Sequence, residues 1–68
     1  MSRLVNSRNT PRPDEVFEAL TSLHDSLSET ACRRAEARLL LLLANHIGDE
    51  AVIREAVALA RKGLDAPA

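Results

Sequence analysis

The sequence is poor in several residue types that small proteins use for folding or catalysis. It contains one cysteine, Cys32, so no disulfide can form within the chain, and its single aromatic residue is Phe17. No apolar run approaches the ~18–20 residues that a membrane-spanning helix needs. The N-terminus also lacks the apolar segment of a secretory signal peptide. We therefore expect no membrane association and a cytoplasmic location, since a lone thiol suits a reducing compartment.

Length and charge narrow the possibilities further. The 68 residues form one domain at most, with nine Lys and Arg against ten Asp and Glu, for a net charge of −1. A chain of this size buries only roughly 60% of its unfolded surface. Natural domains this small usually gain stability from a disulfide, a metal or a partner chain. With the disulfide excluded, the metal and the partner have to be tested against the residues present.

The apolar spacing predicts an all-α protein, a three-helix up-down-up bundle. The helices are expected at about residues 13–27, 29–47 and 50–62, within a single domain over 13–64. Pro13 suits a first helical turn, and Ser28 and Asp49 are good N-caps. Gly48 ends the second helix because glycine accepts the positive φ that often follows a helix. Residues 1–12 are expected to form a flexible tail, with docking of Leu4 and Val5 as the alternative, and residues 65–68 a frayed end.

The second helix should be the central element, because five consecutive leucines from Leu39 to Leu43 cover more than one face. Its main packing face includes Leu39 and Leu42, and a second apolar flank holds Leu40, Ala44 and Ile47. The outermost strip consists of the candidate partner-binding residues Arg34, Arg38, Leu41 and Asn45. An arginine pair beside an uncovered leucine is typical of a protein interface. The alternative is a solvated face with one exposed leucine, which is common.

The sequence offers little for metal binding or catalysis. His24 and His46 lie near opposite ends of antiparallel helices, roughly 20 Å apart at ~1.5 Å per residue. His24 and Cys32 share a turn, but two ligands do not make a structural metal site. There is no phosphate-binding loop and no hydrolase motif, and Cys32 lies on a packing face. We expect no metal, no cofactor and no enzymatic activity.

Nucleic-acid binding is the alternative function, because small three-helix domains often bind DNA. The third helix carries Arg54, Arg61 and Lys62, but the first helix is acidic and the overall charge is slightly negative. A DNA-binding domain usually presents a basic face and a pI well above neutrality. The composition therefore favours a protein partner or self-association over nucleic acid.

The block Leu41–Asp49 (LLLANHIGD), with Pro13-Asp14, Phe17, Leu20 and His24 before it, resembles a family of small uncharacterised proteobacterial proteins. The resemblance covers about residues 13–63. It implies a domain of unknown function, with no known cofactor or catalytic residue. It also implies an association with flavin-dependent hydroxylases of aromatic catabolism. Together with the residue pattern, it suggests a helical interaction module that is either a homodimer or an accessory subunit of a larger complex.

Overall fold

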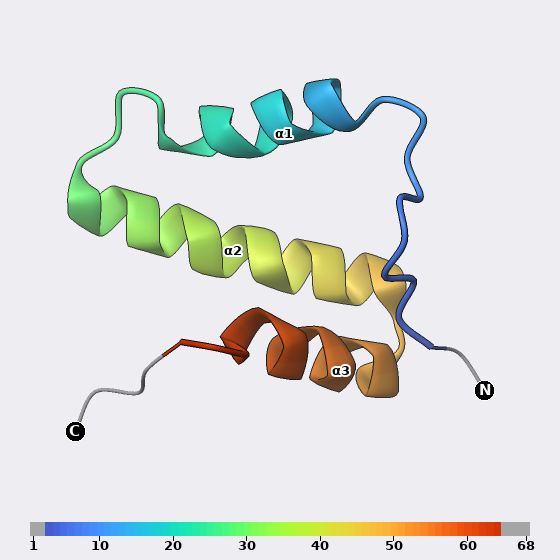
Figure 1. The fold of residues 1–68 in the computed structure, drawn as a ribbon. Helices are drawn as coiled ribbons and strands as arrows, with labels where there is room; N and C mark the ends of the chain where they lie inside the picture. Colours follow the sequence, from blue (N-terminus) through green and yellow to red (C-terminus); the bar gives the residue numbers. More distant parts are fainter. Residues whose placement is uncertain (1–2, 65–68) are drawn as a thin grey trace.

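The computed structural model describes residues 3–64, and this part of the chain is all-α. Its elements are α1 (Pro13–Thr21), the single 3-10 turn η1 (Ser22–His24), α2 (Glu29–Ile47) and α3 (Glu50–Arg61). The predicted three-helix fold is confirmed. Figure 1 shows α2 between α1 and α3, with successive helices running in opposite directions. The predicted frayed end at 65–68 lies outside the described residues.

The helix boundaries follow from local capping. Pro13 opens α1, and Asp14 and Glu15 lie in its first turn, where the positive end of the helix dipole favours carboxylates. The Ser28 hydroxyl accepts the Ala31 N–H at 3.2 Å at the start of α2. Gly48 follows α2 with φ 69°, and its N–H donates to the Ala44 carbonyl at 2.9 Å. These three helix signals act as the sequence predicts.

The predicted end of the first helix is wrong. It was predicted to reach Leu27, but α1 ends at Thr21 and one tighter turn continues to His24. The hydroxyls of Thr21 and Ser22 donate to the Glu18 and Ala19 carbonyls at 3.1 and 2.7 Å, a pattern that competes with regular helix. Ser26 then adopts φ 61°, which turns the chain toward α2. At the other end of the protein, α3 stops at Arg61, one residue before the predicted end.

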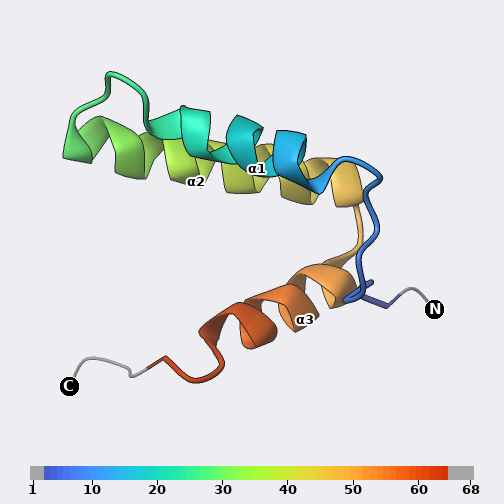
Figure 2. The same ribbon diagram turned by 45° about the horizontal axis from the view of Figure 1, so that its top comes forward.

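The helices make little contact with one another. The backbone of α2 approaches η1 and α3, whereas α1 has no Cα within 8 Å of any Cα of α2 or α3. Figure 2 shows α3 turned away from the pair formed by α1 and α2. None of the described residues is fully buried. The helices are thus the predicted ones, but residues 3–64 close no hydrophobic core by themselves.

The N-terminal segment 3–12 has no regular secondary structure; it starts beside α3 and then crosses to the start of α1 (Figures 1 and 2). The Leu4 N–H donates to the Glu55 Oε1 at 3.5 Å, and the Arg3 guanidinium lies 3.8 Å from the Glu55 Oε2. Of the two apolar residues in the segment, Leu4 is half-buried and Val5 is exposed. Docking of Leu4 therefore occurs in this structure, and the flexibility of residues 1–12 stays a prediction.

Candidate partner-binding surface

The four candidate residues, which we call the arginine strip (Arg34, Arg38, Leu41 and Asn45), lie together on one side of α2. Arg38, Leu41 and Asn45 line a shallow groove of about 400 Å³ with Leu42. A neighbouring groove of about 450 Å³ shares Arg38 and Leu42 with it and also contains Arg34. The other residues of the second groove are apolar: Leu23, Leu27, Ala31, Ala35 and Leu39. The structure thus joins the strip to a continuous apolar surface that reaches η1 and the loop after it.

The exposure of the leucines agrees with the prediction at one position and differs at another. Leu41 is 72% exposed, as expected for the outer side of α2. Leu42 was predicted to pack inside the bundle, but it is 69% exposed. The reason is that η1, near the N-terminal half of α2, makes the close approach to α2, while the α1 backbone stays more than 8 Å away. Leu40, Leu41 and Leu42, in the C-terminal half of α2, are therefore mostly exposed.

The charges of the strip have no counterpart nearby. Among residues 3–64, neither Arg34 nor Arg38 takes part in an ion pair. By contrast, Arg33 lies 3.0 Å from the Glu29 carboxylate one turn away. The positions three and four residues before and after Arg34 and Arg38 hold no acidic residue, so their own helix cannot neutralise them. No carboxylate lines either groove, and the surface is therefore apolar with an uncompensated positive edge.

The two histidines and the cysteine line neither of these grooves. The His24 Nε2 lies 3.3 Å from the Glu36 Oε2, and both side chains are about half exposed. The Cys32 thiol lies 3.9 Å from the carbonyls of His24 and Leu27, which is a long, weak contact. His46 is exposed in the last turn of α2. No three His, Cys, Asp or Glu side chains in the described range come together as a metal site.

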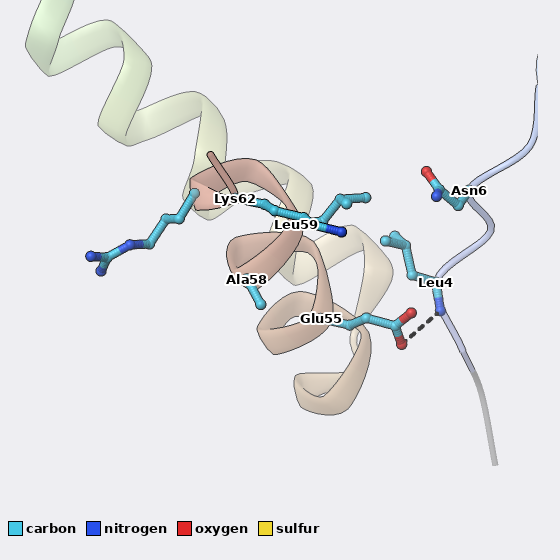
Figure 3. Close-up of a pocket in the computed structure, with 7 residues that line it drawn as sticks. Leu4, Asn6, Glu55, Ala58, Leu59 and Lys62 are labelled. Carbon is cyan, nitrogen blue, oxygen red and sulfur yellow. Dashed lines mark hydrogen bonds between the residues drawn. The ribbon is translucent and has the colours of Figure 1, made fainter. Parts of the chain in front are cut away.

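Sequence reasoning gave too little weight to a third groove, between the N-terminal segment and α3. Figure 3 shows Leu4 and Asn6 facing Glu55 and Leu59 across this groove, whose volume is about 550 Å³. The only signal for it was the apolar pair Leu4 and Val5 in an otherwise polar segment. The Arg3–Glu55 contact is solvent-exposed, and such pairs contribute only ~0–1 kcal/mol. The groove is therefore held mainly by the contact of Leu4 with α3.

None of the helices within residues 3–64 combines the length and the apolar character that crossing a bilayer requires. No curated protein and no solved structure matches the chain significantly. A family model described as "Protein of unknown function (DUF2783)" matches residues 4–62. That match begins at Leu4, so it includes the segment beside α3 together with all three helices. Because it covers most of the chain, the protein belongs to the DUF2783 family of proteins of unknown function.

Proposed function

We propose that this protein is a helical protein–protein interaction module, an accessory subunit that binds an acidic helix of a partner through the arginine strip. The observation that carries the proposal is the unpaired Arg34 and Arg38 beside the exposed Leu41 and Leu42. The proposal includes no catalytic role for the chain itself. A cytoplasmic location accords with the lone Cys32. The family resemblance extends the proposal to a catabolic oxidoreductase as the larger complex.

The shape and charge of the surface define the partner. Arg34 and Arg38 are one helical turn apart, so their side chains are spaced like carboxylates at i and i+4 on a facing helix. Arginine pairs well with carboxylates because two N–H groups can bind two oxygens at once. The leucines of the groove would take the apolar stripe of the same helix, as in other helix-in-groove complexes. The expected partner segment is therefore an amphipathic helix with acidic residues beside its apolar face.

Self-association through this strip is less favourable. A homodimer in which two strips met at a two-fold axis would bring arginines close to arginines. No acidic residue lines the grooves to separate these charges. Like charges opposed across an interface cost several kcal/mol. The arginine strip is thus better suited to a different protein than to a second copy of itself.

A peptide titration tests the proposal. The probe is a synthetic amphipathic helix with a leucine stripe and glutamates at i and i+4, and the matched probe carries lysines instead of the glutamates. We expect calorimetry to detect binding of the acidic peptide only. The double variant Arg34→Ala/Arg38→Ala should weaken binding about 30-fold, from ~1 kcal/mol per lost arginine contact. The control is Arg33→Ala/Arg54→Ala, whose arginines pair with Glu29 and Glu50 outside the strip.

Two results would contradict the proposal. Equal binding of both peptides would mean that the arginines do not select the partner. Binding of duplex DNA with a steep loss of affinity as salt is raised would favour the DNA-binding alternative, because each phosphate contact releases counterions. An acidic peptide is also salt-sensitive, so the comparison uses the peptide and the duplex at the same salt concentrations.

A further inference from the structure

A second apolar face lies on the other side of α2 from the arginine strip. Leu40, Leu43 and Ile47 recur at i, i+3 and i+7, so they share one side of the helix. At ~100° per residue, this side lies roughly 160° from the centre of the arginine strip. Leu40 is 67% exposed, Ile47 49% and Leu43 45%. This side of α2 therefore presents a row of partly uncovered aliphatic side chains.

The first helix extends the same face. Phe17, Leu20 and His24 recur at i, i+3 and i+7 through α1 and η1. The 3.3 Å contact between the His24 Nε2 and the Glu36 Oε2 indicates where this row lies, because Glu36 precedes Leu40 by one turn of α2. The neighbouring Leu23, by contrast, reaches the groove that contains Arg34 and Arg38. The α1 row thus lies on the Leu40 side of α2.

We define this second apolar face by five residues: Phe17, Leu20, Leu40, Leu43 and Ile47. Phe17 is its most exposed member at 69%, and Leu20 is about half exposed. At the Glu36 end, the face is bordered by the contact between His24 and Glu36, and not by an arginine without an acidic partner. Two copies of the face can therefore meet about a two-fold axis without opposing an unpaired arginine. The arginine strip differs in this respect, because two copies of it would bring unpaired arginines together.

The exposed surface area of the chain can be compared with that of a compact monomer of the same mass. The chain exposes 6387 Å². A compact monomer of 7.4 kDa is expected to expose about 4,200 Å². The difference of about 2,200 Å² per chain falls within the ~1,000–2,500 Å² per subunit that obligate homodimers bury. The surface that the chain exposes beyond that of a compact monomer, polar and apolar together, is thus of the size that a stable dimer buries.

We propose that a second copy of this chain packs on the second apolar face, so that α1 and α2 of two protomers form a four-helix core. A two-fold arrangement places the same residues on both sides of the contact. It covers Phe17, Leu40 and Ile47, which are 69%, 67% and 49% exposed within one chain. It leaves the arginine strip of each protomer free on the outside. The dimer is therefore independent of the acidic-helix binding proposed above.

Sedimentation equilibrium of the full chain and two matched variants tests this inference. The wild type should have twice the 7.4 kDa mass at micromolar concentration. Leu40→Glu should weaken association at least 100-fold, because it places a carboxylate in the contact. Leu41→Glu, at the neighbouring position on the strip side, should leave the dimer intact. If Leu40→Glu loses its helical circular dichroism, the uncharged Leu40→Gln is used, and it should weaken association about tenfold with helicity retained.

Three results would overturn the inference: a folded 7.4 kDa wild type at every concentration, a dimer that persists in both Leu40 variants, or dissociation caused by Leu41→Glu alone. The last result would place self-association on the arginine strip. Titration of the acidic peptide into the same samples keeps the two proposals apart, since loss of the dimer in Leu40→Glu should leave peptide affinity unchanged.

Discussion

Replacing Leu41 by glutamate tests whether this residue lies on a contact surface or in the core. Leu41 is 72% exposed, so about a quarter of its side chain is covered by the chain itself. Fully burying a leucine contributes about 1.5–3 kcal/mol, and the change should therefore cost the folded chain only about 0.5 kcal/mol. In the complex with an acidic helix, the new carboxylate would face the partner's carboxylates and displace an apolar contact. We expect a loss of about 2–3 kcal/mol, or roughly 30- to 150-fold in affinity.

The matched control is Leu39→Glu. Leu39 lies two positions earlier in α2, on the side that faces η1, and it is half-buried. A carboxylate there should cost the fold ~2–4 kcal/mol, a large share of the stability of so small a domain. Circular dichroism and calorimetry with the acidic peptide are measured on both variants. Equal unfolding of both would refute the assignment of Leu41 to the surface, and normal peptide binding by a folded Leu41→Glu would refute its role in the contact.

The remaining predictions concern the turn between α2 and α3 and the absence of a structural metal. Asp49→Ala removes the acceptor of the Ala51 and Val52 N–H groups, at 2.9 and 3.2 Å, and should lower the free energy of unfolding by about 1 kcal/mol in urea titrations. Gly48→Ala should cost about 1–2 kcal/mol by the same assay, because φ is 69° while the added Cβ meets no atom closer than 3.8 Å. Addition of EDTA should leave the helical circular dichroism unchanged, and its loss would point to a metal site between chains.

The helices could be predicted from local signals, and their mutual packing could not. Ser28, Gly48 and Asp49 set their boundaries through hydrogen bonds within a few residues, which the sequence displays directly. The early end of α1 was missed because apolar spacing continues to Leu27, whereas the hydroxyls of Thr21 and Ser22 bond back to the helix. Periodicity reports the side of a helix on which a residue lies and says nothing about what covers that side.

At the candidate site, too, local grouping could be predicted from the sequence, whereas exposure and long-range contacts could not. Helical spacing along α2 correctly grouped Arg38, Leu41 and Asn45, because residues three and four positions apart share a side of a helix. It assigned Leu42 to the core, since nothing in the sequence states that the backbone of α1 keeps its distance from α2. The contact of Leu4 with Glu55 joins residues 51 positions apart, and no local pattern encodes it. Exposure and long-range contact therefore required the structure.

Thermal unfolding over a hundredfold range of protein concentration tests most directly whether the chain completes its core with another chain. None of the described residues is buried in the single chain, so association should add to the stability of its folded state. The account predicts that the unfolding midpoint of the wild type rises with concentration, because subunits that bind only in the folded state stabilise it by mass action. A cooperative transition with the same midpoint at every concentration, from a species of 7.4 kDa, would contradict it.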